Sequence, residues 1–221
     1  MLTIQNSTCE TSGTFDSLLR SNGYKTEVIY ATKENALPNP GNYDGVMILG
    51  GPMSVYDDNS SIREQMQLIN HAIKLEVPLL GVCLGSQLIA QTSGGRVFKG
   101  AKKEIGWRPV HATKEGKQSL LSGLEDPLWI FQWHGDTYQL PPSAQLLAYS
   151  DLYPQAFRIG SALGVQFHVE VDQRLVRSWI SEYKKEVNSE GLTPNEIIGE
   201  EIMFDQLPEM CTRILHNFLS R

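Results

Sequence analysis

The residue with the clearest chemical potential is Cys83, which stands in the segment Gly81-Val82-Cys83-Leu84-Gly85. The apolar residues before it predict a strand, and residues 84–92 predict a helix. A cysteine on such a sharp turn is held in a strained backbone conformation at the carboxyl end of the strand. Its thiol faces the helix N-terminus, where the dipole and free N–H groups favour the thiolate. The pattern indicates a nucleophile; a buried core cysteine in a glycine-flanked turn is the alternative.

A second suggestive pattern is the alternation of apolar and polar residues over 164–172, which predicts a strand. His168 and Glu170 then project from the same face. A carboxylate beside an imidazole holds its tautomer and stabilises the cation that forms when the ring takes a thiol proton. By itself this segment is more typical of an ordinary amphipathic strand with a solvated face. Together with Cys83, it supplies a nucleophile, a base and an orienting carboxylate.

Two further segments could complete a site for acyl transfer. Gly50-Gly51-Pro52 ends another apolar run, and glycine allows a backbone N–H to approach a substrate closely. The N–H groups of Gly51 and Leu84 are therefore candidate donors to an oxyanion, although a plain strand-ending turn is the simpler interpretation of this segment alone. His134 follows a further predicted strand, with Asp136 two residues on, and is a rival to His168 as the base.

The elements that must position these residues alternate regularly in the first half of the chain. The expected strands are 2–5, 27–30, 45–49 and 77–82, and the expected helices are 14–20, 60–75 and 84–92. Ser60 or Ser61 is expected to cap the second helix. Apolar strands separated by helices indicate a parallel sheet that is covered on both faces, with ligands bound at the carboxyl ends of the strands.

The second half contains shorter strands and two closing helices. The expected strands are 107–112, 128–133, 146–149, 156–159 and 162–171, and the expected helices are about 173–187 and 204–219. Residues 188–201 are polar and acidic and indicate a surface loop or a poor helix. We therefore predict a single α/β domain over residues 1–221, flavodoxin-like and doubly wound. Its mostly parallel sheet carries helices on both faces and a small antiparallel extension.

Composition excludes several classes of function. With 19 basic and 25 acidic side chains, the formal charge of −6 argues against a nucleic-acid partner. No apolar run approaches a membrane span and the first residues lack a signal-peptide pattern, so a cytoplasmic protein is expected. Three widely spaced cysteines predict neither a disulfide framework nor a zinc site, and no metal or cofactor is expected. We interpret Cys211 as core and Cys9 as incidental.

In their order along the chain, these residues resemble the class I, or triad-type, glutamine amidotransferases. The matching segments span about residues 44–171 and are Gly50-Gly51-Pro52, Gly81-Val82-Cys83-Leu84-Gly85-x-Gln87, Glu104-x-Gly106, His134-Gly135-Asp136 and Val165-Gln166-Phe167-His168-x-Glu170. The chain is most similar to small stand-alone members related to the glutaminase part of GMP synthetase.

The resemblance implies a triad of Cys83, His168 and Glu170, and an oxyanion hole made by the N–H groups of Gly51 and Leu84. It also implies that the substrate glutamine is held by three residues: Gln87, His134 and Asp136. One departure is Val169, where the family usually has proline; valine suits extended backbone, so the spacing of His168 and Glu170 should persist. A second is that the sequence has neither an S-G-G-x-D-S loop nor a Walker motif, so GMP synthesis is not expected of this chain alone.

Four functions remain open at this stage. The first is a glutaminase that releases ammonia for a separate synthase subunit or acceptor, and the second is a stand-alone hydrolase of γ-glutamyl peptides or other γ-glutamyl compounds. The third is a non-enzymatic flavodoxin-like cysteine protein, against which Glu170 argues. The fourth is an α/β-hydrolase that uses Cys83 and takes its acid from one of three residues before His168: Asp126, Asp136 or Asp151.

Overall fold

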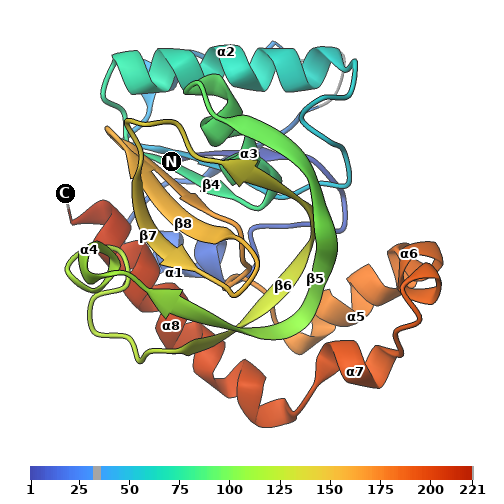
Figure 1. Cartoon of the computed structure of the whole chain (residues 1–221). Helices are drawn as coiled ribbons and strands as arrows, with labels where there is room; N and C mark the ends of the chain where they lie inside the picture. The colour runs from blue at the N-terminus through green and yellow to red at the C-terminus, as the bar shows by residue number, and fades with distance from the viewer. Residues whose placement is uncertain (32–35, 221) are drawn as a thin grey trace.

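The computed structural model describes residues 1–31 and 36–220, and within them nine strands form one sheet (Figure 1). The strand order is β2-β1-β3-β4-β9-β8-β7-β5-β6. The parallel part consists of β1 (Leu2–Gln5), β2 (Glu27–Tyr30), β3 (Val46–Ile48), β4 (Leu79–Val82) and β9 (Ala162–Val165). All residues of β1, β3, β4 and β9 are buried, as expected for parallel strands that are covered on both faces.

The antiparallel part continues from β9 through four strands: β8 (Pro154–Ile159), β7 (Gln145–Tyr149), β5 (Arg96–Ala112) and β6 (Leu128–Gln139). Both β5 and β6 are longer than predicted, because they pair with each other beyond their apolar stretches. Lys99 pairs with Asp136 and Glu104 pairs with His134, so residues 100–103 form a bulge in β5. A bulge re-aims the side chains around it, and here it lies beside the residues expected to form the site.

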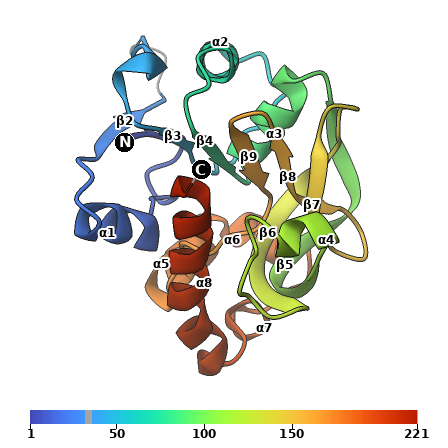
Figure 2. The ribbon, with the colours of Figure 1, turned by 90° about the vertical axis from the view of Figure 1, so that its left-hand side faces the viewer.

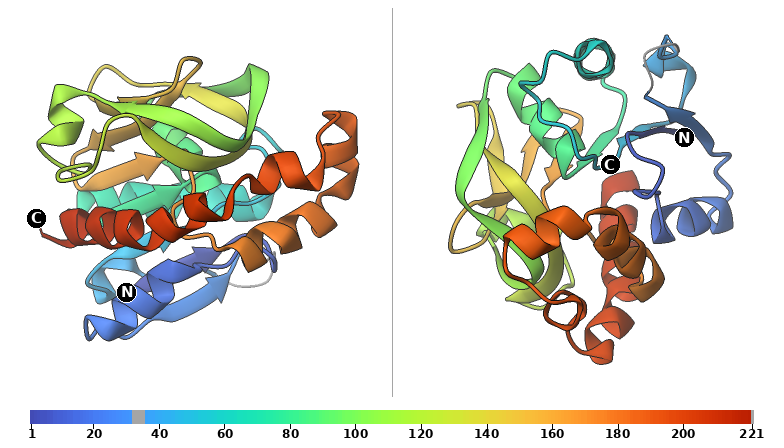
Figure 3. Two further views of the ribbon diagram at one scale, coloured as in Figure 1. Left: turned by 90° about the horizontal axis from the view of Figure 1, so that it is seen from below. Right: turned by 90° about the vertical axis from the view of Figure 1, so that its right-hand side faces the viewer.

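Helices cover both faces of the sheet (Figure 2). One face carries α2 (Ser60–Lys74) and α3 (Leu84–Thr92), and the other carries α1 (Thr14–Ser21), α5 (Gln173–Glu182) and α8 (Glu201–Leu219). Two separate clusters of buried apolar side chains correspond to these two faces. Figure 3 shows α8 lying between α1 and the long antiparallel strands, where it contacts both α1 and β6. Among the described residues, no helix has the length and hydropathy that crossing a bilayer requires.

Several predicted boundaries were wrong. The N-cap of α2 is Asn59, whose side chain accepts a hydrogen bond from the Ser61 N–H, and neither serine is the cap. The predicted helix over 173–187 is two helices, α5 and α6 (Lys184–Ser189), that meet at Tyr183. The region expected to be a loop contains α7 (Pro194–Ile198), which has a capping box at Thr193, and α8 begins three residues before the predicted start. A short helix, α4 (Lys114–Lys117), and a 3₁₀ turn, η1 (Pro40–Asn42), complete the chain.

The segment that carries His168 and Glu170 is not a regular strand, contrary to the prediction. β9 ends at Val165, and beyond it only an isolated bridge joins His168 to Phe131. The segment has no solvated face, because His168 and Glu170 are as buried as its valines. Its backbone groups are satisfied from outside the sheet ladder: the His168 N–H donates to the Phe131 carbonyl, and the Glu170 carbonyl accepts from the Thr14 N–H.

Gly81 and Gly85 make the turn around Cys83 possible. A Cβ on Gly81 would lie 2.5 Å from the carbonyl carbon and oxygen of Gly85. A Cβ on Gly85 would overlap the carbonyl oxygen of Ile48 on the neighbouring strand β3. Since both obstacles are backbone atoms, neither can move without shifting a strand or a helix. The turn therefore requires glycine at both positions.

We expect Gly85→Ala to lower the free energy of unfolding by about 1–3 kcal/mol, because the new methyl group meets the backbone of β3. Gly135→Ala is the matched control, since its Cβ would meet only the flexible side chain of Lys103 at 3.3–3.4 Å. Urea denaturation of the two variants measures the difference. Equal stabilities would contradict the close approach of α3 to β3.

Candidate active site

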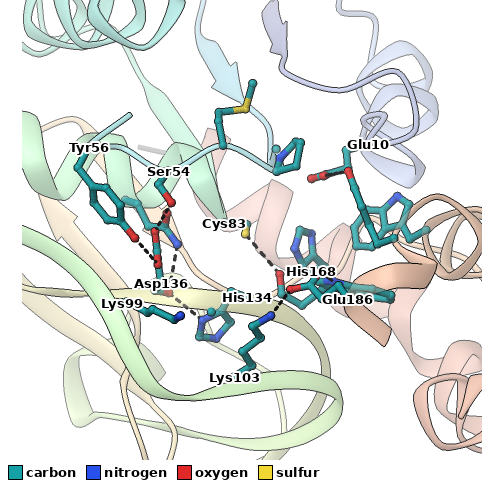
Figure 4. Close-up of a pocket in the computed structure, with 18 residues that line it drawn as sticks. Glu10, Ser54, Tyr56, Cys83, Lys99, Lys103, His134, Asp136, His168 and Glu186 are labelled. Atoms are coloured by element: carbon teal, nitrogen blue, oxygen red, sulfur yellow. Dashed lines mark hydrogen bonds and ion pairs between the residues drawn. The ribbon is translucent and has the colours of Figure 1, made fainter. Parts of the chain in front are cut away.

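A pocket of about 330 Å³ opens at the carboxyl ends of the parallel strands (Figure 4). Glu10 follows β1, Gly51 follows β3, Cys83 follows β4 and His168 follows β9, and all four line this pocket. Parallel strands end at one edge of their sheet, so segments far apart in the sequence meet here.

Cys83 is held in the conformation that its sequence context predicted. Its φ is +50° and its ψ is −106°, a region that residues other than glycine rarely occupy. Its N–H donates to the Val165 carbonyl at 2.8 Å, which ties the turn to β9. The Sγ atom lies 3.8 Å from the Trp133 carbonyl oxygen and 3.6 Å from Nε2 of Gln166. Strain of this kind persists only where the surroundings enforce it, and it is typical of functional sites.

His168 and Glu170 form a short buried pair, with 2.6 Å between Nδ1 and Oε1. Both side chains are almost completely inaccessible to solvent. Burial by itself disfavours the charged imidazolium, but the charge of Glu170 and hydrogen bonding to Cys83 outweigh it and hold the pKa of His168 well above its ordinary value. Val169 between them is fully buried, so valine is compatible with this spacing.

The positions of Cys83 and His168 relative to each other can be followed from Gly50. Gly50 has no Cβ, but a Cβ added to it would lie 3.6 Å from Cβ of Cys83 and 3.3 Å from Cε1 of His168. It would also overlap a carboxylate oxygen of Glu10. The side chains of Glu10, Cys83 and His168, which follow three different strands, therefore meet beside Gly50, where any larger residue would collide with them. The structure brings the predicted nucleophile, base and orienting carboxylate together.

Gly51 and Leu84 lie side by side at this edge. A Cβ on Gly51 would be 3.0 Å from Cδ2 of Leu84 and 2.7 Å from Cβ of Asn6, so a side chain would not fit there. Leu84 is the first residue of α3, and an N–H at that position has no acceptor within its own helix. Gly51 lines the pocket next to Cys83. Gly51 and the first residue of α3 thus lie next to each other beside Cys83.

Gln87 and Asp136 are linked on the other side of Cys83. Nε2 of Gln87 donates to the Asp136 carbonyl at 3.2 Å and to Oε1 of Gln166 at 3.3 Å. The Asp136 carboxylate accepts from the hydroxyl of Ser54 at 2.8 Å and from that of Tyr56 at 3.0 Å. A carboxylate that is anchored in this way is a fixed acceptor on the pocket wall, close to the amide of Gln87.

His134 does not compete with His168 for Cys83. Its Nε2 lies 3.0 Å from Oε2 of Glu104, and its Nδ1 lies 2.9 Å from the Asp136 carbonyl oxygen, so both ring nitrogens are engaged. The Glu104 carboxylate also accepts from Nε2 of Gln155 at 2.7 Å. His134 itself lines the pocket, and the buried Glu104 holds its ring and so supports the strand that carries Asp136.

The acids considered for an α/β-hydrolase arrangement lie elsewhere or are already engaged. Asp126 pairs with Lys117 at 2.7 Å, Asp136 is held by the two hydroxyls described above, and Asp151 is exposed and does not line the pocket. Cys211 is fully buried, as expected for core. Cys9, which we interpreted as incidental, contacts the hydroxyl of Tyr183 at 3.3 Å. In the described part of the chain, no group of three potential ligands is arranged to hold a metal ion.

Sequence reasoning missed part of the pocket wall. Glu10 follows the first predicted strand, and this position beyond a carboxyl end is the signal that could have marked it. The other missed residues come from the β3 loop, the β5 bulge and the segment from α5 to α6; they are Ser54, Tyr56, Lys99, Lys103, Trp179, Tyr183 and Glu186. No local pattern marks these residues, because the loop after β3, the irregular pairing of β5 with β6 and the break between α5 and α6 bring them to the pocket.

Comparisons with known proteins find similar sequences and similar folds. The family model for glutamine amidotransferase class-I matches residues 12–181. The glutamine amidotransferase-like protein YfeJ of Salmonella typhimurium is 30% identical over 187 residues, which cover 80% of this chain and 78% of YfeJ. A glutamine-hydrolysing GMP synthase of Chromobacterium violaceum is 36% identical over 138 residues, which cover 57% of this chain but only 25% of the synthase.

Among solved structures, the crystal structure of a glutamine amidotransferase from Thermotoga maritima superposes with a TM-score of 0.91 at 31% identity. The alignment covers 100% of this chain and 97% of that one. The match confirms the predicted α/β fold class, including the antiparallel extension.

The buried network behind the pocket makes a stability prediction. Glu104→Ala leaves His134 and Gln155 without their shared acceptor, so we expect the free energy of unfolding to fall by about 3–5 kcal/mol. Glu125→Ala removes an exposed carboxylate and should change it by less than about 0.5 kcal/mol. Guanidinium denaturation of both variants makes the comparison, and a Glu104→Ala protein as stable as the control would contradict the network's role.

Proposed function

Because the chain belongs to the class I glutamine amidotransferase family, we propose that it hydrolyses the side-chain amide of glutamine through Cys83, His168 and Glu170. The observation that carries the proposal is the buried 2.6 Å pair of His168 and Glu170, adjacent to a strained cysteine at the same sheet edge. Strands from both halves of the chain share one sheet, which supports residues 1–221 as one glutaminase domain.

In the first half of the reaction, the Cys83 thiolate forms a bond to the amide carbon, and the carbonyl electron pair moves to the oxygen. The N–H groups of Gly51 and Leu84 hydrogen-bond to that oxyanion; one such donor typically contributes roughly 2.7–4 kcal/mol to lowering the barrier. The imidazolium of His168 gives its proton to the leaving nitrogen, and the carbon–nitrogen bond breaks. Ammonia leaves, and a γ-glutamyl thioester remains on Cys83.

In the second half, His168 takes a proton from water, and the resulting hydroxide attacks the thioester carbon. The carbon–sulfur bond breaks, which releases glutamate and regenerates the thiolate. Glu170 is the positioning residue: it accepts the hydrogen bond from Nδ1, so that Nε2 remains available for the reacting atoms. Its negative charge also stabilises the imidazolium.

The glutamyl portion of the substrate is assigned to the wall formed by Gln87 and Asp136. The Gln87 amide and the anchored Asp136 carboxylate offer a donor and an acceptor within one pocket. His134 lines the same pocket and belongs to this wall, where its ring also holds the Asp136 carbonyl. No cofactor enters this scheme.

Ammonia released here would serve a separate synthase or another acceptor. Such a partner is supported by the similarity to a GMP synthase. The alignment covers only 25% of that synthase, so the rest of it has no counterpart in the matched part of this chain. The second candidate is a hydrolase of γ-glutamyl compounds that acts without a partner. One observation favours this second candidate: the pocket is lined by Tyr183 and Glu186 as well as by His168.

The nucleophile can be tested by labelling and replacement. We expect a glutamine-mimicking electrophile such as 6-diazo-5-oxonorleucine to label Cys83 stoichiometrically, and Cys83→Ala to abolish release of glutamate. Cys9→Ala is the matched control and should still be labelled. Peptide mapping by mass spectrometry identifies the modified residue, and thermal denaturation confirms that Cys83→Ala is folded. A label on Cys9, or normal turnover by Cys83→Ala, would contradict the assignment.

The role of Glu170 predicts a change in pH dependence. The alkaline limb of kcat/KM reports loss of the proton from His168, whose pKa is held high by the charge of Glu170. Glu170→Gln removes that charge, so the alkaline limb should move to lower pH while kcat/KM falls by roughly 10²–10⁴-fold. Glu182→Gln, an exposed change of the same kind on α5, should leave the profile unchanged. If the alkaline limb of Glu170→Gln did not move, the claim that Glu170 raises the pKa of His168 would be contradicted.

A further inference from the structure

The pocket has two halves, which Cys83 and His168 divide (Figure 4). One half, here the glutamyl half, is lined by Ser54, Tyr56, Gln87, Lys99 and Asp136. The other, here the leaving-group half, is lined by Glu10, Lys103, Trp133, Trp179, Tyr183 and Glu186. The inference below rests on the proposed function, in which His168 protonates the leaving nitrogen. Whatever is attached to that nitrogen must therefore lie on the side of His168.

The leaving-group half is larger than ammonia requires. Ammonia is a single heavy atom, yet six side chains form this half. The whole pocket, at about 330 Å³, is within the range of about 300–1,000 Å³ that is typical of sites for drug-sized ligands. Glutamine is smaller than such ligands. The six side chains that line this half thus favour a substrate whose amide nitrogen carries a substituent.

Glu10 is the residue that gives this half its chemical character. Its side chain is buried, and Oε1 accepts a hydrogen bond from the Tyr183 hydroxyl at 2.6 Å. Oε2 lies so close to Gly50 that a Cβ there would overlap it, and Cε1 of His168 is 3.3 Å from the same Cβ site. One carboxylate oxygen is thus fixed by Tyr183, while the other lies against Gly50, on the side of the His168 ring that carries Cε1.

The remaining charges in the leaving-group half are already paired. Lys103 lies 2.6 Å from Glu186 and 3.0 Å from Glu190, and the other carboxylate oxygen of Glu186 accepts from Nε1 of Trp133 at 3.1 Å. Glu10, in contrast, has no lysine or arginine partner among the described residues. Burial raises the pKa of Glu10, against the opposing effects of Tyr183 and His168, as expected for a carboxyl that lacks a full countercharge.

The aromatic rings of this half suit the same kind of ligand. The ring centroid of Trp133 lies 6.0 Å from that of Trp179 and 5.9 Å from that of Tyr183. The three rings therefore form one continuous aromatic surface. Aromatic faces attract cations through their quadrupole, most strongly when the cation is desolvated. A buried carboxylate and an aromatic wall are together a recognition site for an organic ammonium group.

We propose that the leaving-group half binds a positively charged amine substituent, so that the preferred substrates are γ-glutamyl amides of diamines or of similar cationic amines. The free ammonium end lies against Oε2 of Glu10, and the γ-glutamyl end occupies the glutamyl half. Hydrolysis then gives glutamate and the free cationic amine, with the proton on the leaving nitrogen supplied by His168.

Two isosteric substrates test this directly: the mono-γ-glutamyl amide of 1,2-diaminoethane, and γ-glutamyl-n-propylamide, in which a methyl group replaces the ammonium. We expect the wild-type chain to prefer the cationic amide in kcat/KM by roughly 10- to 100-fold, the effect of one hydrogen bond to a charged group. Glu10→Gln should bring this ratio close to one. Because both rates are measured on one preparation, the ratio does not depend on how much of the variant is folded.

Glu182→Gln is the matched control, since it removes an exposed carboxylate outside the pocket and should keep the wild-type ratio. A wild-type ratio near one, or a ratio that Glu10→Gln does not change, overturns the subsite. If glutamine is hydrolysed but neither amide is, the subsite is wrong and the proposed function stands. If glutamine and both amides all fail to release glutamate, the proposed function fails and the subsite fails with it.

Discussion

The strained turn at Cys83 is the constraint on which the rest of the site depends. A residue with a side chain is held at φ +50° because β4 must reverse into α3 within a few residues. Gly81 and Gly85 allow α3 to approach β3 and β4 closely enough for that reversal. The hydrogen bond from the Cys83 N–H to Val165 then fixes the turn against β9. Together these contacts hold the sulfur at one place on the sheet edge, and the other functional groups are arranged around it.

The His168–Glu170 pair lies beyond the end of β9, where only an isolated bridge to Phe131 continues the sheet. Both side chains are nevertheless buried, because other parts of the chain enclose this segment. Taking two ionisable groups out of water is costly, and a short hydrogen bond with good geometry is what makes it tolerable. Because the pair is buried, solvent does not weaken the electrostatic effect of the Glu170 carboxylate on the His168 imidazole.

Around this common centre, the two halves of the pocket use different loops and helices but share the strands β5 and β6. The glutamyl half comes from the β3 loop, α3 and β6, and it is stabilised from behind by the buried network of His134 and Glu104. The leaving-group half comes from the end of β1, the β5 bulge and the break between α5 and α6. β5 and β6 contribute to both halves, because Lys99 and Lys103 lie on β5 and Trp133 and Asp136 lie on β6.

The sequence by itself determined the alternation of strands and helices, the cysteine turn, and the residue types of nucleophile, base and carboxylate. These are local properties: apolar runs set burial, and glycines beside a cysteine restrict its backbone. The sequence did not determine the length of β5 and β6, the end of β9 at Val165, the break at Tyr183 or the place of Glu10. Tertiary structure decided these, because cross-strand pairing, bulges and packing between distant segments override local propensity. Which side chains face the sulfur depends on where strand ends meet, and that is a property of the whole sheet.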